Sequence, residues 1–390
     1  MDHLLAEPED LQHVRDAVRR FVTREFPRDT IAKWEREDFV PREVSKRIGE
    51  LGFGGLCVPE EYGGVGRQVV TMTVVLEELS RWSVSLATIF NMSSNYGAMN
   101  IVESGSAEQK ERLLPGLMSG EILFAYGLSE PDVGADLANV KTRAERRGDR
   151  LIINGTKRWC TGASMADYIY ALVRSGPPEA RRENLSFVLV PTNAQGLTIT
   201  PLEVMGSKGV QTNDVQFDNV EVPVENIVGG EANWNRGWSL LAGPSLEVEK
   251  LGPTAISLGV ACAAIEEAWE YSQQRVQGGR RICGHQAVRH TLADLQTKLL
   301  TCRLLLRHAA LLVEEHKPSA AVTSMAKLHV CETARDIVLA CQQYVMGAYG
   351  CSELFRMPGL VRDALPAQIV GGSSAIQRNN IANLLKLPRE

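Results

Sequence analysis

Two short segments in the first half of the chain carry side chains that suit a flat, partly polar ligand. Residues 126–136 place a tyrosine and the hydroxyl of Ser129 at a Ser-Glu-Pro turn. Residues 157–162 place Trp159 two positions before Thr161. An aromatic face can stack on a planar cofactor, while hydroxyls and backbone N–H groups bond its polar edge. The two segments together predict one wall of a cofactor site.

A third segment offers a candidate base. Residues 245–250 read Ser-Leu-Glu-Val-Glu-Lys, and Pro253 follows Glu249 by four positions. A carboxylate gains basicity when an apolar pocket desolvates it, although such charged clusters more often lie on solvated helix surfaces. Because proline cannot donate to the carbonyl four residues earlier, we expect the helix to be broken or bent at 249–253, or to begin near Pro253. A regular straight helix there would count against Glu249.

The elements that must position these residues fall into three parts. Apolar residues recur at helical spacing within 11–21 and 72–79, and again within 255–268, 292–306 and 337–345. Between them, short apolar runs predict strands at 168–173, 187–190, 197–200, 215–217 and 220–222. Asn154–Gly155 between apolar runs predicts a hairpin with a type I′ turn.

The predicted architecture is therefore α+β. We expect an N-terminal α-helical domain at 1–122, a middle β-sandwich or barrel domain at 123–232, and a C-terminal helical bundle at 233–390. A chain of 390 residues is long enough for two or three domains. The apolar surplus of the last part suits an oligomer.

Composition excludes several classes of function. The net charge of −5 leaves no basic footprint for nucleic acid, and no apolar run approaches eighteen residues, so no membrane span is expected. The acidic start lacks a basic or Arg-rich leader, which leads us to expect a cytoplasmic protein. The 8 cysteines are scattered without a Cys-x-x-Cys pair, which favours free thiols over disulfides or a metal site.

The two cofactor segments resemble the flavin-binding middle domain of the acyl-CoA dehydrogenase family. The resemblance implies FAD, with the isoalloxazine ring lined by Tyr126, Leu128 and Ser129. It also implies that Trp159 packs on one face of the flavin and that Thr161 bonds the pyrimidine edge. The chain departs from the family at Ala135, a position bordering the ligand where a serine is usual.

Two further phrases extend the resemblance to the C-terminal part. Residues 275–286 resemble the family's R-x-x-F-G-x-x-I-x-x-x-Q, which implies that Arg275, and less directly Gln286, contact the FAD of a neighbouring subunit. Gly278 stands where the family has phenylalanine, and Tyr344 stands where it has glutamine. Near the end, the resemblance places three small residues beside the cofactor: Gly347, Gly372 and Ser373.

The family resemblance also shows that the usual catalytic glutamate is missing, because its position is Gly371. Isovaleryl-CoA and long-chain dehydrogenases carry the base instead on a helix, thirty residues before the glycine that aligns with Gly279, and a basic residue follows it. Here that position is Glu249, followed by Lys250. Glu249 is therefore the candidate base, Lys250 and Gly371 border the substrate, and Glu247 is the control.

The implied reaction is FAD-dependent α,β-dehydrogenation of an acyl-CoA thioester, in which Glu249 takes the α-proton and flavin N5 takes hydride from Cβ. The implied partners are an electron-transfer flavoprotein and identical subunits in a homotetramer. Region 83–100 contains no Arg or Lys, which argues against a distal carboxylate on the acyl group, and the glycines at 371–372 leave room for a branched or bulky one. Alternatives are non-oxidative or reductase chemistry, a carrier-protein thioester, or a catalytically silent partner subunit.

Overall fold

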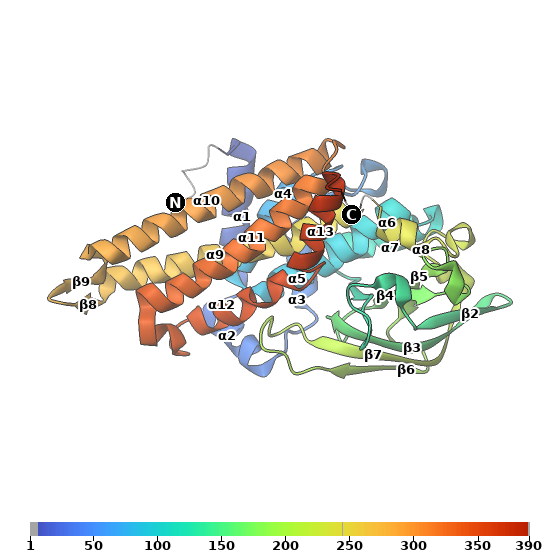
Figure 1. Ribbon diagram of the computed structural model, residues 1–390. Helices are drawn as coiled ribbons and strands as arrows, with labels where there is room; N and C mark the ends of the chain where they lie inside the picture. The colour runs from blue at the N-terminus through green and yellow to red at the C-terminus, as the bar shows by residue number, and fades with distance from the viewer. Residues whose placement is uncertain (1–6, 244, 389–390) are drawn as a thin grey trace.

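The computed structural model describes residues 7–243 and 245–388, and helices occupy both ends of this chain (Figure 1). The N-terminal helices pack on one another through buried apolar faces. They are α1 (Glu9–Glu25), α2 (Arg28–Glu37), α3 (Val44–Gly49), α4 (Val69–Trp82), α5 (Val84–Ser93), α6 (Asn100–Ser104) and α7 (Ala107–Met118). A π-helical turn, η3 (Ser94–Met99), joins α5 to α6. Such turns are frequent at functional sites.

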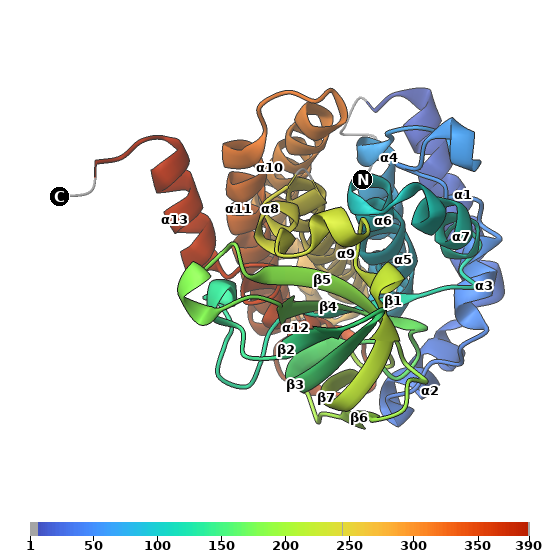
Figure 2. The same cartoon turned by 90° about the vertical axis from the view of Figure 1, so that its right-hand side faces the viewer.

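The middle of the chain forms one curled, seven-stranded sheet, seen end-on in Figure 2. Its strands are β1 (Phe124–Gly127), β2 (Arg143–Arg147), β3 (Arg150–Thr161), β4 (Tyr168–Arg174), β5 (Leu185–Pro191), β6 (Leu197–Pro201) and β7 (Thr212–Pro223). The order is β1-β4-β2-β3-β7-β6, and β5 also pairs with β4. The parallel register of β1 and β4 sets Tyr126 opposite Tyr170.

Long helices make up the rest of the molecule. After the short α8 (Gly237–Leu241) come α9 (Ser245–Gln274), a small β8–β9 hairpin (Val276–Gln277 and Arg280–Arg281), α10 (Gln286–Glu314), α11 (Ala320–Ala340), α12 (Met357–Ala364) and α13 (Ser374–Leu384). Helix α9 is long and apolar enough to cross a membrane, but 83% of its most apolar window is buried inside the molecule. Burial of that kind is what a core helix requires.

Three local predictions are wrong. Asn154–Gly155 is no hairpin turn, because β3 runs through it with a bulge between Ile153 and Gly155. Gly155 takes φ +146° there, where a Cβ would lie 2.5 Å from the Thr142 hydroxyl. The hairpin instead turns at Gly148, between β2 and β3.

The two strands predicted at 215–217 and 220–222 are one strand, β7. Asn219 adopts a left-handed φ of 51° and pairs through its side chain with Asn154, so the chain passes a turn-like Asp-Asn pair without reversing. Tyr344 falls within the helical apolar spacing predicted at 337–345, but it lies in a π-helical turn after α11 and is 68% exposed.

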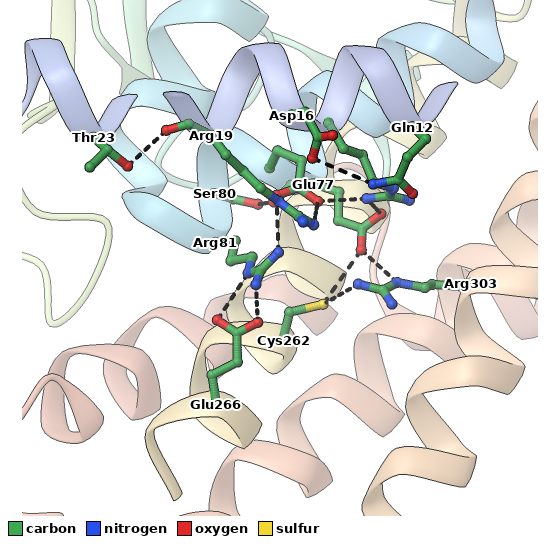
Figure 3. A network of polar contacts seen from close by, with 12 residues as sticks. Gln12, Asp16, Arg19, Thr23, Glu77, Ser80, Arg81, Cys262, Glu266 and Arg303 are labelled. Carbon is green, nitrogen blue, oxygen red and sulfur yellow. Dashed lines mark hydrogen bonds and ion pairs between the residues drawn. The ribbon is translucent and has the colours of Figure 1, made fainter. Parts of the chain in front are cut away.

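A buried charge network fastens the N-terminal helices to the C-terminal ones (Figure 3). Glu77 of α4 accepts a hydrogen bond from Arg303 of α10 at 2.7 Å and pairs with Arg15 of α1 at 2.9 Å. Cys262 of α9 lies 3.4 Å from the same carboxylate. Burial alone would raise the pKa of Glu77, but the charges of Arg15 and Arg303 outweigh it and lower that pKa.

Candidate active site

The candidate base lies in the first turns of α9. The predicted break is wrong, and so is a helix start near Pro253, because α9 continues unbroken from Ser245 through Glu249 and Pro253. Pro253 has no N–H to give to the carbonyl of Glu249, so one helical hydrogen bond is lost there while the helix continues. Just beyond, the Thr254 hydroxyl donates to the carbonyl of Lys250 at 2.6 Å. Packing against α4 and α11 holds the segment helical. The continuous helix counts against Glu249 by the expectation stated above, and the case for this residue rests on its place beside a pocket.

Glu249 borders a small pocket, with an enclosed volume of about 10 Å³, between α9, the sheet and α8. Its apolar walls are Leu128, Phe187, Leu240 and Leu241. The polar groups that line it are Asn100, Tyr126, Tyr170, Ser245 and Glu249 itself. The sheet, the α5–α6 junction and α9 therefore all contribute to one site, as a reaction chamber with a single carboxylate would require.

Desolvation sets the acid–base character of Glu249. Burial raises its pKa to about 7, and the charges of Lys327 and Lys250 pull in the opposite direction. A carboxyl group with a pKa near neutrality is well suited to general base catalysis at physiological pH. In turn, burial and the Glu249 charge raise the pKa of Tyr126 and of Tyr170, so both hydroxyls stay protonated.

The two lysines near Glu249 differ in their partners. Lys250 donates to both oxygens of Glu247 at 2.9 and 3.0 Å, and the Thr323 hydroxyl donates to Glu247 as well. Lys250 is thus engaged away from the pocket, and Glu247 is a structural residue. Lys327 of α11 is 2% exposed, and its ammonium donates to the Ala367 carbonyl at 3.3 Å.

Gly371 lies beside Lys327 and Pro253. A Cβ built on Gly371 would meet Pro253 Cγ at 3.3 Å and Lys327 Cε at 3.6 Å, and its φ is +59°. A side chain at this position would therefore be strained as well as crowded. Because Pro253 lies one turn after Glu249 on α9, positions 249 and 371 approach the same region from two directions.

The two cofactor segments meet on the sheet. Lys157, fully buried, donates to the Leu128 carbonyl at 3.0 Å and to Glu130 at 2.9 Å. The N–H of Arg158 donates to the Ser129 carbonyl at 2.9 Å. Lys157 and Glu130 therefore position both halves of the wall. The sequence analysis did not identify this pair, although Lys157 lies two residues before Trp159 and Glu130 directly follows Ser129.

The wall has the form that a flat ligand needs. Trp159 is 59% exposed and has a left-handed φ of 66° beside a bulge between Lys157 and Cys160. Such exposure and strain are unusual for tryptophan. The Arg158 guanidinium lies 5.9 Å from the ring centroid, and the ring still offers enough open surface for a flat ligand. The Thr161 hydroxyl lies 3.0 Å from that of Thr212, a paired donor–acceptor edge. An isoalloxazine ring fits this combination of aromatic face and polar edge.

Other predicted contacts lie elsewhere. Arg275 and Gln286 flank the β8–β9 hairpin, and Arg275 follows Glu249 by 26 residues along α9 and its end, roughly 39 Å. The Arg275 guanidinium instead lies 5.2 Å from the Tyr349 ring. Gly347 begins a 3₁₀ turn near that same end, and Ala135 is exposed. Within one chain these residues do not reach the pocket.

Gly372 and Ser373 lie at the start of α13. The Ser373 hydroxyl accepts from the N–H of Ile376 as the N-cap, and the Gln377 amide donates to the Gly372 carbonyl at 3.0 Å. Helix α13 projects from the body of the molecule (Figure 2). These contacts are those of a helix start.

Sequence reasoning missed Tyr170, Asn100 and Lys327. The apolar residues Ile89, Phe90, Met92 and Met99 of region 83–100 are core residues at most 2% exposed. A signal for the polar lining was present, since region 91–100 contains three asparagines and two serines within an apolar helix pattern. Lys327 carries no such signal, because a lysine in a helix is ordinarily solvated.

Comparisons with known proteins agree over the whole length. Family models match at 8–121 (acyl-CoA dehydrogenase, N-terminal domain), 125–220 (middle domain) and 235–386 (C-terminal domain). An acyl-CoA dehydrogenase of Bacillus subtilis (strain 168) is 34% identical over 94% of this chain and 97% of its own. The CarC subunit of the caffeyl-CoA reductase–Etf complex of Acetobacterium woodii is 29% identical over 95% and 97%. Butyryl-CoA dehydrogenase of Megasphaera elsdenii superposes with a TM-score of 0.91 at 27% identity, covering 98% of this chain and 99% of that one.

Proposed function

Because this chain belongs to the acyl-CoA dehydrogenase family, we propose that Glu249 is the base of an FAD-dependent α,β-dehydrogenation of an acyl-CoA thioester. The chain is an oxidoreductase that uses FAD. Named relatives, among them glutaryl-CoA and short-chain acyl-CoA dehydrogenases, catalyse dehydrogenation, so the silent-partner and non-oxidative alternatives are not favoured.

The observation that supports this role is the place of Glu249. Its carboxyl group borders the pocket from α9 and has a pKa of about 7. Gly371, where most relatives carry the base, is crowded by Pro253 and Lys327 and has a left-handed backbone. Glu249 reaches the same region from α9, so it can supply the carboxylate that is missing at position 371.

The side chains of the site have separate roles in the reaction and in binding the cofactor. Glu249, ionised, takes the α-proton of the thioester, and the pocket excludes water so that the carboxylate keeps its basicity. When bound, FAD accepts the hydride that leaves Cβ. Trp159 would pack on the ring, Thr161 and Ser129 would bond its edge, and Tyr126 and Leu128 would close the space between ring and acyl group.

The proposal also covers the oligomeric state of the enzyme, its electron acceptor and its location. Arg275 and Gln286, together with Gly347, lie too far from Glu249 to serve the same chain's site, so we place them against the FAD of a second subunit, in the tetramer that is usual in the family. An electron-transfer flavoprotein is the acceptor, in line with the complex named for CarC. The protein works in the cytoplasm on CoA or carrier-protein thioesters, with the domains divided at about 122 and 232.

Anaerobic titration of the purified flavoprotein with acyl-CoAs tests the assignment. Straight, branched and aromatic thioesters are added in turn while the oxidised-flavin absorbance is followed. We expect at least one class to bleach the flavin in wild type and in Glu247→Gln, but not in Glu249→Gln. Equal bleaching in both variants would remove Glu249 from the role of base.

A further inference from the structure

The pocket beside Glu249 carries hydroxyl groups that an alkyl chain would leave unpaired. Tyr170 is 2% exposed and lines the pocket. Among the described residues its hydroxyl has no hydrogen-bond partner, and the oxygen is not fully enclosed but accessible from the pocket. Buried hydroxyls are nearly always hydrogen-bonded, and one that stays unpaired is costly. The Tyr170 hydroxyl therefore indicates a polar atom on whatever fills the pocket.

The hydroxyl of Tyr126 can also donate a hydrogen bond to a ligand in the pocket. The Asn100 amide donates to the Tyr126 hydroxyl oxygen at 2.6 Å and to the Tyr96 carbonyl at 3.0 Å. Since the amide occupies a lone pair of the Tyr126 oxygen, the hydroxyl proton remains available to donate. Asn100 thus orients Tyr126 as a donor toward the space that it shares with Tyr170.

Both rings are held rigidly. Tyr126 stacks on Tyr96 with centroids 4.1 Å apart, and Tyr170 lies 4.5 Å from Phe187. The centroids of Tyr126 and Tyr170 are 5.6 Å apart, because β1 and β4 pair in parallel with these residues opposite each other. Hydrogen-bond donors fixed in this way by packing discriminate well between ligands.

The charge and the size of the pocket further limit which acyl groups it can bind. The pocket contains the Glu249 carboxylate, and no lysine or arginine lines it in the described part of the chain. A negatively charged acyl group would be repelled, so the polar atom is neutral. The enclosed volume of the pocket is only about 10 Å³, so a long acyl chain would not fit beside these groups. This size suits a short acyl group.

From these contacts we propose that the enzyme acts on a short acyl thioester carrying a neutral oxygen, a hydroxyl or carbonyl beyond Cβ, which Tyr126 and Tyr170 bind by hydrogen bonds. The proposal rests on the dehydrogenase function assigned above, with Glu249 at the α-carbon. The oxygen selects the substrate and takes no part in the redox step. An alkyl acyl group of the same length binds less well because it leaves the Tyr170 hydroxyl and the Tyr126 hydroxyl proton without a partner.

Matched thioesters test this directly. Pentanoyl-CoA is compared with 5-hydroxypentanoyl-CoA and 4-oxopentanoyl-CoA as reductants of the flavin, in wild type, Tyr170→Phe and Tyr168→Phe. Tyr170→Phe keeps the ring and loses only the hydroxyl. Tyr168 is the control, since it lies on the same strand two residues away and contacts Phe124 outside the pocket.

In wild type we expect kcat/KM for an oxygenated thioester to exceed that for pentanoyl-CoA by about 10-fold or more. Tyr170→Phe should reduce this preference to about 3-fold or less, by lowering kcat/KM for the oxygenated thioester and raising it for pentanoyl-CoA, and Tyr168→Phe should leave the preference unchanged. A wild-type preference for pentanoyl-CoA, or an unchanged preference in Tyr170→Phe, would overturn the proposal.

Binding measurements distinguish a failure of this inference from a failure of the dehydrogenase assignment. Dissociation constants are measured by calorimetry for the same thioesters in Glu249→Gln, with and without Tyr170→Phe. If no thioester bleaches the flavin yet the oxygenated ones bind more tightly through Tyr170, the dehydrogenase assignment fails and the pocket chemistry stands. If the flavin is bleached and binding shows no preference, the substrate inference alone fails.

Discussion

Replacing Glu249 by glutamine removes the base while keeping the size of the side chain. A positioned general base contributes about 10²–10⁴-fold to a proton-transfer step, so the rate of flavin bleaching by acyl-CoA should fall by at least about 100-fold. Trp159 and Thr161 are unaffected by the change, so FAD content should match wild type. The matched control is Glu247→Gln, which loses part of an ion pair with Lys250 and should unfold at lower temperature but still bleach.

The pH dependence follows from the raised pKa. With a pKa of about 7, the ionised fraction of Glu249 is about one tenth at pH 6 and about nine tenths at pH 8. The wild-type rate of bleaching should therefore rise through neutrality and level off above pH 8. Stopped-flow absorbance under anaerobic conditions, at saturating acyl-CoA, measures this limb.

The free energy of unfolding should fall as pH rises, whereas the rate of bleaching rises. The folded pKa of Glu249 lies above the ordinary value of 4.5, so the folded state binds the proton more tightly and loses stability as pH rises from 4.5 through 7. Ionisation in the fold costs up to about 3 kcal/mol. Glu249→Gln should therefore be more stable than wild type at pH 8 and equal to it below pH 4.5. Bleaching within about 10-fold of wild type, together with unchanged stability at pH 8, would refute the argument.

Three further changes test other parts of the structure. Lys327→Met should raise the pKa of Glu249, because the Lys327 charge is the first of those that lower it, and should shift the rising limb of the pH–rate profile to higher pH; Lys327→Arg should leave the limb in place. Trp159→Ala should change the unfolding free energy of the apoprotein by less than about 0.5 kcal/mol, since the ring is 59% exposed, but should weaken FAD binding by about 10-fold in a fluorescence titration; equal FAD affinity would contradict its place in the wall. Glu77→Gln should cost about 3–5 kcal/mol in urea unfolding, because Arg15 and Arg303 lose their common partner; the loss should be full above pH 4.5 and shrink as pH falls toward the lowered pKa of Glu77, where wild type is protonated too.

The order of elements was predictable from periodicity, and the turns were less so. Helical spacing within 255–268 and 292–306 identified α9 and α10 because apolar buried residues recur there every three or four positions. Asn154–Gly155 misled because its turn propensity is local, whereas the bulge is set by pairing of β3 with β7. The break expected at Pro253 failed for a similar reason, since tertiary packing of α9 outweighs one missing hydrogen bond.

The site was predictable only in part. Glu249 emerged from spacing against a known family, and Trp159 and Thr161 from residue type. Tyr170 and Lys327 could not be found in this way, because their significance lies in what faces them across α9 and the sheet. A tyrosine in a strand and a lysine in a helix are ordinary in sequence.

The buried ion network also constrains how the chain can be made. Arg303, which neutralises Glu77, follows it by 226 residues, an interval of roughly 10–45 s on the ribosome at about 5–20 residues per second. Until Arg303 emerges, α1 and α4 cannot close over Glu77 without burying a carboxylate that lacks one of its two partners. The nascent N-terminal helices should thus stay open and accessible to chaperones for most of translation, and close only when α10 arrives.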